Sequence, residues 1–435
     1  MEVRKIDFWS ATSMVIANMI GTGVFTSLGF QLGDLHQGFS LIMVWFLGGL
    51  IALTGAICYA EVANRLPKDG GEFYFLSEMF HPALGFMAGF VSTTVGFAAP
   101  VAGASLALGA YVEGVWPDVS GKLVATIVVV GITLIHAFSL KFGLLFQRIS
   151  TLSKVLIILA FVIVGLYLPS KSDISFLPNA AAMNEVWQGN WFVPAFSISL
   201  VWVSFAYSGW NASAYIAGSI INPQKNLSRS IILGTISVTV MYLLLNMVFL
   251  KSAPISELVG KKEVGLVAAR SLFGDKIGAI MGGIISVLLI STISSMIFTG
   301  PRVLKTMFEK MNLWPRLYTL SKHETPAGAI YFQGVLSLVL LFTMNFESLI
   351  YYVAFTLSTF TLLTVIGMMK MRIKMGKPTG YSAWGYPVTP IIFIIMTASV
   401  AWYFINNKPF ESALGLATSL FGLVLWGIIN KRKTT

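Results

Sequence analysis

The chain has 435 residues, of which 56% are hydrophobic and 11% are charged, and its formal net charge is +11. Soluble globular domains carry about 25% charged and about 45–50% apolar residues, so the composition excludes an ordinary soluble domain and indicates a membrane protein. A single cysteine excludes an intrachain disulfide, and the basic residues lie between apolar runs, so a nucleic-acid-binding protein is not expected.

Twelve apolar runs are long enough to be transmembrane helices, because a bilayer crossing needs about 20 mostly apolar residues. In chain order these runs are residues 8–30, 40–63, 84–112, 121–140, 145–168, 191–217, 230–250, 277–300, 328–345, 348–369, 387–405 and 411–430. A transmembrane barrel would instead show alternating segments of about ten residues. The sequence therefore predicts an all-α integral membrane protein with twelve spans.

Lysine and arginine residues are distributed unequally between the two sides of these spans. The side that holds both chain ends has 21 of them and the other side has 8. Since cytoplasmic loops carry the excess of basic residues, both termini are predicted to be cytoplasmic. Residues 251–276 hold five of the eight external ones, and this segment could re-enter the bilayer as a short helix.

The first run is interrupted in its middle by polar and small residues, namely Asn18, Gly21, Thr22 and Gly23. Each glycine costs about 1 kcal/mol relative to alanine within a helix, which favours a break at this point. Close helix packing is the alternative interpretation, but it favours glycines spaced by four residues.

The sixth run carries a matching disturbance at residues 205–211, Phe-Ala-Tyr-Ser-Gly-Trp-Asn. Serine and glycine are also ordinary packing residues in membrane helices. However, the first and sixth runs open two halves of five spans each, and interrupted helices in corresponding positions indicate the binding site of a transporter. A broken helix offers free N–H groups to a carboxylate and free carbonyls to an ammonium group, so an α-amino acid is the predicted substrate.

These motifs resemble those of the amino acid–polyamine–organocation (APC) transporter superfamily, and within it the bacterial L-type amino acid transporter-like permeases. Residues 21–25 (GTGVF) are similar to the family's G-S-G-I-F, and residues 59–75 are similar to its Y-x-E-L…P…G-G-x-Y-x-Y pattern. Further matches are residues 205–211, residues 222–223 (NP) and residues 386–390 (YPVTP). The resemblance implies a LeuT-like core of two inverted repeats, residues 1–168 and 191–369, with two additional spans at 387–430, in a single membrane domain.

The resemblance also implies roles for individual residues. The backbone amides of Thr22 and Gly23 would bind the substrate carboxylate. The carbonyls of Met19, Phe205 and Ser208 would bind its ammonium group. Phe205 would also be the aromatic gate that closes over the substrate from outside, and Ala206 would line the side-chain pocket.

Five further residues are candidates on the same grounds. Asn18 and Gly21 flank the first break, and Tyr242 and Asn246 match a seventh-span pattern of the family. Lys154 is a basic residue well inside the fifth span, where a lysine snorkelling to the interface is the alternative interpretation. The resemblance implies that Lys154 replaces a sodium ion and ties the first span to the eighth, or carries a proton.

The chain departs from the family pattern in three places. Ser219 stands where the family usually has glutamate, and Ser228 stands where proline is common. A cytoplasmic charge pair is therefore expected to be missing. The loop at residues 113–122 lacks the cysteine that animal members use to bind a heavy subunit, so no such disulfide-linked partner is expected.

The acidic residues, including Asp34, Glu61 and Glu113, fall near span ends or in loops, so no carboxylate is expected near the pocket. Because an unpaired buried charge is costly, this favours small to medium neutral amino acids, with cationic amino acids or polyamines as the alternative. Two interrupted helices favour a carrier over a channel.

A membrane-embedded enzyme would need paired acids, a metal-ligand cluster or a nucleophile with its base, and His136 with Ser139 is the nearest candidate. A structural histidine is the preferred interpretation. We predict a sodium-independent exchanger or proton-coupled carrier of the cytoplasmic (inner) membrane of a prokaryote, without metal or cofactor.

Overall fold

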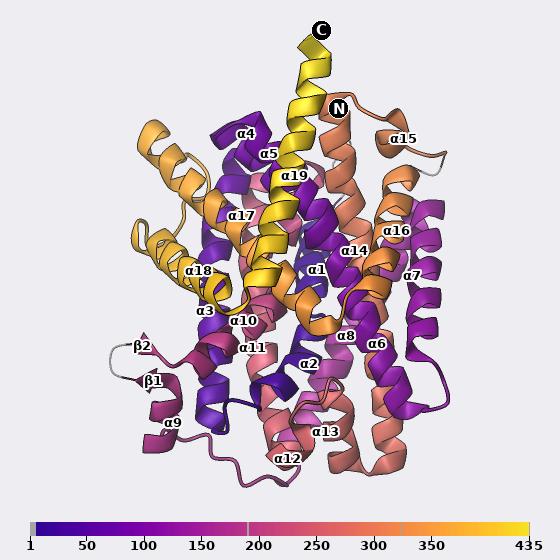
Figure 1. Ribbon diagram of the computed structural model, residues 1–435, viewed down its shortest axis with the longest axis vertical. Coiled ribbons are helices and arrows are strands. Elements are labelled where there is room, and N and C mark those ends of the chain that lie inside the picture. Colours follow the sequence, from indigo (N-terminus) through magenta and orange to yellow (C-terminus); the bar gives the residue numbers. More distant parts are fainter. Residues whose placement is uncertain (1–5, 189–190, 323, 435) are drawn as a thin grey trace.

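The computed structural model describes residues 6–188, 191–322 and 324–434, and within these ranges the chain is almost entirely helical (Figure 1). Ten of the described helical segments are long and apolar enough to cross a membrane. They are Phe8–Gln31, Gly38–Arg65, Pro82–Val115, Gly121–Phe138, Leu145–Tyr167, Pro223–Ser252, Asp275–Met311, Phe346–Met375, Val388–Asn407 and Pro409–Lys431.

Two of the twelve predicted spans are shorter than this. The sixth is divided into α10 (Pro194–Ala206) and the 3-10 helix η2 (Ala212–Ser219), because the predicted break interrupts it. The ninth is α16 (Ala327–Thr343), a helix of 17 residues. Ten of the twelve predicted spans are therefore long enough to cross a membrane. Shorter apolar helices lie at the positions of the other two.

The first half of the chain contains five predicted spans and a short helix between the second and third. Its elements are α1 (Phe8–Met19), α2 (Thr22–Gln31), α3 (Gly38–Arg65), α4 (Glu72–Met79), α5 (Pro82–Val91), the π-helix η1 (Ser92–Ala98), α6 (Ala99–Val115), α7 (Gly121–Phe138) and α8 (Leu140–Tyr167). Asp7 starts α1 by accepting a hydrogen bond from the Ser10 amide at 2.7 Å. This hydrogen bond lowers the pKa of the Asp7 carboxyl.

The second half begins with a short connection and then repeats the pattern of long helices. The connection holds α9 (Ala180–Val186) and an antiparallel pair, β1 (Trp187–Gln188) and β2 (Trp191–Phe192). After α10 and η2 follow α11 (Pro223–Ser252), α12 (Ile255–Leu258), α13 (Val264–Phe273), α14 (Asp275–Met311), α15 (Pro315–Tyr318), α16, α17 (Phe346–Met375), α18 (Val388–Asn407) and α19 (Pro409–Thr434).

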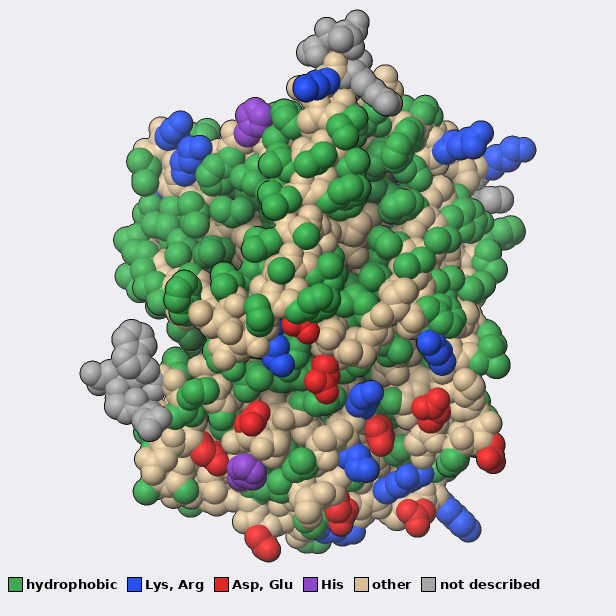
Figure 2. Space-filling model, viewed as in Figure 1, with side chains coloured by type: hydrophobic (Ala, Val, Ile, Leu, Met, Phe, Trp, Pro, Cys, Tyr) green, Lys and Arg blue, Asp and Glu red, His purple; other side chains and the backbone are tan. Residues whose placement is uncertain are grey.

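Burial separates the helices into a centre and a periphery. In the most apolar 18-residue stretch of Phe8–Gln31, 83% of the residues are buried, whereas in that of Pro409–Lys431 only 17% are buried, although its mean hydropathy is higher, 1.9 against 1.4. On the face shown in Figure 2, hydrophobic side chains cover the middle of the molecule. So large an exposed apolar surface requires lipid around it, which makes this chain a multi-pass membrane protein.

The two chain ends lie at the same end of the bundle, and α12 and α13 lie at the opposite end (Figure 1). The Asp and Glu side chains visible in Figure 2 gather in the half that lies away from the chain ends. Residues 251–276, the segment that could re-enter the bilayer, contain the short helices α12 and α13, and α13 packs against α14 and α2. The amide of Gly260, just before α13, donates to the carbonyl of Gly29 at 2.8 Å.

Candidate substrate site

The first span is broken where the sequence predicts it. The helix α1 ends at Met19 and α2 begins at Thr22, while Ile20 and Gly21 have non-helical backbone angles. No side chain caps the start of α2, and the first amides of a helix have no partner within it. Thr22 and Gly23 thus occupy the positions where a helix offers N–H groups to an anion.

The sixth span breaks beside the first. The helix α10 ends at Ala206, and Gly209 has a φ of +95°, in the region that favours glycine. A Cβ atom on Gly209 would lie 2.9 Å from the carbonyl carbon of Asn18. The two breaks therefore touch, and a side chain at Gly209 would separate them.

Tyr242, on α11, joins the two breaks. Its hydroxyl lies within hydrogen-bond distance of the carbonyl of Met19 and, at 3.0 Å, of the carbonyl of Ala206, so the two carbonyls share its one proton. Asn246, one turn further on, donates from Nδ2 to the Tyr242 carbonyl at 2.8 Å and is completely buried. Met19, a predicted ammonium ligand, thus already shares its carbonyl oxygen with Tyr242.

Lys154 is completely buried, so the interpretation of a lysine snorkelling to the interface is wrong. Its Nζ atom donates to the carbonyl of Ile20 at 2.6 Å and to the Oγ1 atom of Thr292 at 2.8 Å. Thr292 Oγ1 in turn donates to the same carbonyl at 3.0 Å. The ammonium group thereby ties the break of the first span to α14, the eighth span.

An open cavity lies beside the two breaks, and residues from six long helices line it. Its lining includes Asn18, Ser92, Phe97, Ser208, Gly209, Trp210, Asn211, Met296, Leu357, Ser358 and Phe393. Of the predicted site residues, Asn18 and Ser208 line this cavity. The other predicted residues are not among its lining residues, namely Met19, Gly21, Thr22, Gly23, Lys154, Phe205, Ala206, Tyr242 and Asn246. Between the breaks, Gly23 packs directly on Ala206.

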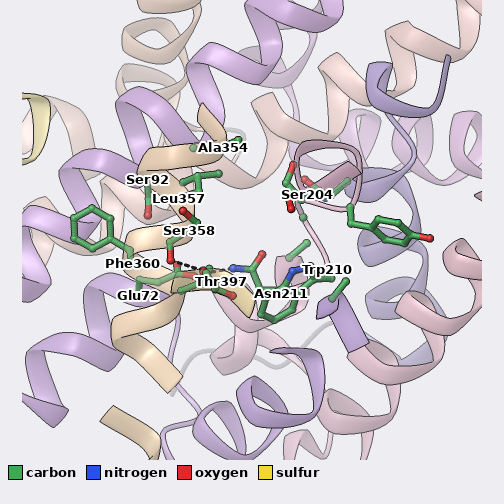
Figure 3. Close-up of a pocket in the computed structure, with 18 of the residues that line it drawn as sticks. Glu72, Ser92, Ser204, Trp210, Asn211, Ala354, Leu357, Ser358, Phe360 and Thr397 are labelled. Carbon is green, nitrogen blue, oxygen red and sulfur yellow. Dashed lines mark hydrogen bonds between the residues drawn. The ribbon is translucent and has the colours of Figure 1, made fainter. Parts of the chain in front are cut away.

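The expectation that no carboxylate lies near the pocket is wrong. Glu72 is 2% exposed and lines the cavity (Figure 3). Its Oε1 atom accepts hydrogen bonds from the Tyr59 hydroxyl and from Nδ2 of Asn211, both at 2.8 Å. Tyr215 lines the same cavity beside them. We call Glu72, Tyr59, Asn211 and Tyr215 the Glu72 cluster.

Sequence reasoning missed Glu72 because it lies in a connection between two spans. Gly71 just before it has a φ of +54°, and a Cβ atom there would lie 2.2 Å from the Tyr215 ring. The start of α4 thus lies against Tyr215 of η2, and the first residue of α4, Glu72, lies in the cavity lining. The Gly70-Gly71 pair in the family pattern was the available signal.

Asp69 connects the same region to the end of the sixth span. Its Oδ1 atom accepts from the Gly218 amide at 2.7 Å, and its Oδ2 atom accepts from the Ser219 hydroxyl at 3.0 Å. Ile6 adds a backbone bridge, donating to the carbonyl of Ser219 at 3.1 Å. Ser219, the departure from the family's glutamate, thus pairs with a carboxylate instead of supplying one. Ser228, the other departure, is buried on α11.

His136, the nearest candidate for an enzyme site, is buried on α7. Its Nε2 atom lies 2.7 Å from the Ser294 hydroxyl of α14, and its ring packs edge-on against Phe298. These contacts join two helices, as expected for a structural histidine.

A bundle of membrane-spanning helices in which two interrupted helices meet beside a cavity has the architecture of a secondary transporter. A family model described as amino acid permease matches residues 6–428. The chain therefore belongs to the amino acid permease family of the APC superfamily, whose members are transporters and not enzymes.

Several curated proteins are similar to nearly the whole chain. The serine/threonine exchanger SteT of Bacillus subtilis is 27% identical over 440 residues, covering 99% of this chain and 98% of its own. The human large neutral amino acids transporter small subunit 2 is 26% identical over 437 residues, covering 97% and 80%. The mouse b(0,+)-type amino acid transporter 1 is 26% identical over 380 residues, covering 85% and 76%.

Proposed function

We propose that this permease exchanges small to medium neutral L-amino acids across the cytoplasmic membrane by alternating access, without sodium. The amides of Thr22 and Gly23 would bind the substrate carboxylate, and the carbonyls of Met19, Phe205 and Ser208 would bind its ammonium group. Phe205 would close over the substrate, and Ala206 would limit its side chain. The core would consist of the inverted repeats 1–168 and 191–369, followed by two spans within 387–430.

The position of Lys154 carries this proposal. Its ammonium group donates to the Ile20 carbonyl in the first break and to Thr292 on the eighth span. A fixed positive charge between these two elements supplies what a bound cation would otherwise supply. We therefore expect a transporter that needs no sodium ion.

The substrate class and the exchange mode are supported by the relatives. One is named a serine/threonine exchanger and another a large neutral amino acids transporter. Proton-coupled uptake remains the alternative mode. The distribution of basic residues supports cytoplasmic termini, and the relative from a bacterium supports a prokaryotic inner membrane.

Purified protein in liposomes tests the proposal. We expect a radiolabelled neutral amino acid to enter faster when unlabelled amino acid is inside, and equally fast when choline replaces external sodium. The protein alone should be active, because the proposal includes no heavy subunit. If uptake is lost when choline replaces sodium, the transporter is not sodium-independent. If a pH gradient drives uptake into liposomes that contain no amino acid, the transporter is proton-coupled and not an exchanger.

A second candidate, transport of cationic amino acids, is favoured by one observation. Glu72 places a carboxylate in the lining of the cavity, where a positively charged side chain could pair with it.

A further inference from the structure

We propose that the Glu72 cluster is a second subsite of the transport cavity, which binds the charged amino group on the side chain of a diamino acid. The inference rests on the proposed function, because it assumes that the α-carboxylate and α-ammonium groups bind at the two helix breaks. It adds a specificity-determining residue that lies outside both breaks.

Only one oxygen of the Glu72 carboxylate forms short hydrogen bonds with the described residues of the protein. Both hydrogen bonds, from Tyr59 and Asn211, go to Oε1. The other oxygen, Oε2, is buried and has no hydrogen bond of normal geometry to the residues that the structure describes, although the Tyr215 hydroxyl lies close enough to interact with the carboxylate. A buried oxygen of this kind is costly to leave without a good hydrogen-bond donor, so a ligand that supplies one is stabilised there.

Glu72 also has no cationic partner among the described side chains, unlike the other buried glutamate, Glu61. Glu61 pairs with Arg65 at 3.1 Å and with Arg372 at 2.9 Å. Glu61 therefore contributes to the structure of the α3 and α17 ends and is not available to a substrate. A buried ionisable group that lines a cavity and lacks such a partner is a candidate functional residue.

The cavity connects Glu72 with the substrate groups at the breaks. Asn18 from the first break and Ser208 from the second line the same cavity as Glu72. Asn211, two residues after Gly209, reaches Glu72 directly with its amide (Figure 3). A ligand in this cavity can thus reach Asn18 and Ser208 at the edges of the two breaks as well as Glu72, while Thr22 and Gly23 lie outside the cavity lining in this conformation.

The walls around Glu72 suit a short aliphatic stem with a charged end. Trp210 lines the cavity and packs edge-on against Tyr59 with ring centroids 4.8 Å apart. Aromatic rings attract ammonium groups as well as covering methylene groups. An ammonium group can donate a charge-assisted hydrogen bond to a carboxylate, and such bonds are roughly twice as strong as hydrogen bonds between neutral groups.

The test uses the protein in liposomes and the uptake of a radiolabelled neutral amino acid. Inhibition by diaminobutyrate and by ornithine is compared with inhibition by norvaline, which has a similar stem and no side-chain charge. The variant Glu72→Gln keeps an oxygen for Tyr59 and Asn211 but removes the charge. Glu78→Gln is the matched control, because Glu78 lies on the same helix and pairs with Lys310 at the surface.

We expect both diamino acids to inhibit the wild type, and Glu72→Gln to weaken this inhibition about tenfold, equivalent to about 1.4 kcal/mol. Inhibition by norvaline should change less than twofold, and Glu78→Gln should behave as the wild type. If diamino acids do not inhibit uptake by the wild type, the inference is overturned. A Glu72→Gln variant that loses norvaline and diamino acids equally also overturns it, since this would indicate a purely structural role.

Two further comparisons separate a failure of the variant to fold, or of the proposed function, from a failure of the subsite. If Glu72→Gln does not fold, Glu72→Asp is used instead, in which the carboxylate lies one methylene group further from the ligand. Inhibition by ornithine should then become stronger relative to inhibition by diaminobutyrate. If the relative inhibition by the two diamino acids does not change, the inference is overturned. If the wild type transports no neutral amino acid at all, the proposed function fails. If it transports neutral amino acids but not diamino acids, the subsite alone fails.

Discussion

Gly23 lies directly on Ala206, so that a Cβ atom on Gly23 would be 2.4 Å from the Ala206 Cα atom. Real Cβ atoms essentially never approach another atom this closely, and the neighbour here is backbone that cannot rotate away. The contact joins the start of α2 to the end of α10. Even a methyl group at position 23 must therefore push the two broken helices apart.

We expect Gly23→Ala to reduce uptake at least tenfold and Gly23→Leu to abolish it, because both displace the amides predicted to bind the carboxylate. Gly131→Ala on α7 is the control, since a Cβ atom there meets nothing within 4 Å. That change should leave uptake intact and stabilise the helix by up to about 1 kcal/mol. Normal uptake by Gly23→Leu would place the substrate site elsewhere.

Tyr242 should be required for the geometry of both breaks. Tyr242→Phe removes the hydroxyl that reaches the carbonyls of Met19 and Ala206, leaving a buried oxygen on each helix without this donor. A lost hydrogen bond of this kind costs about 1–3 kcal/mol. We expect a lower melting temperature and at least fivefold slower uptake.

The control for Tyr242 is Tyr331→Phe, because Tyr331 is 48% exposed on the lipid-facing side of α16. Thermal unfolding in detergent and initial uptake rates are the two measurements. If Tyr242→Phe melts and transports as the wild type does, the hydroxyl is dispensable and the link between the breaks must come from packing alone.

Lys154 should be essential for transport, and no other cation should replace it. Lys154→Met keeps the volume but removes both hydrogen bonds, to Ile20 and to Thr292. We expect uptake to fall more than tenfold and not to recover when sodium is added. Lys305→Met, which removes an exposed pair with Glu309, should have little effect. Sodium-stimulated recovery in Lys154→Met would instead reveal a cation site that the ammonium group normally occupies.

The sequence predicts these features because they are local or carry a charge. The breaks at Gly21 and Gly209 follow from glycine in the middle of an apolar run, and Lys154 is visible as a charge within a span. Glu72 could not be found this way, because its burial depends on packing between α4 and η2, which are separated by more than a hundred residues. Two fewer spans than predicted are long enough to cross, because a break divides the sixth span and the ninth, α16, has only 17 residues.

The contact between Asp69 and the end of η2 should control access to the cavity from one side. Asp69 accepts from the Gly218 amide and the Ser219 hydroxyl, and the bridge between Ile6 and Ile220 lies beside them. Asp69→Ala removes the acceptor for both donors. We expect it to favour opening at this end, because nothing then replaces the two hydrogen bonds.

Opening can be followed with a cysteine in the cavity lining. Cys58 is the one cysteine of the chain, so Cys58→Ser gives a background for Ser92→Cys. A charged maleimide applied from the side of the chain ends should label Ser92→Cys several-fold faster when Asp69→Ala is added. Ser219→Ala, which removes one of the two hydrogen bonds, should have a smaller effect. Equal labelling rates in all three proteins would show that this contact does not hold the cavity closed.

Phe205 should affect turnover more than affinity if it is the gate. It is 6% exposed at the end of α10, one residue before Ala206 and the break. Phe205→Ala leaves the backbone groups proposed to bind the substrate but removes the ring that would close over it. We expect kcat of exchange to fall about tenfold while KM changes less than threefold, since gating limits the cycle and binding does not. Phe332→Ala, at a position 41% exposed on α16, controls for the loss of an aromatic side chain. A raised KM with unchanged kcat would make Phe205 a binding residue rather than a gate.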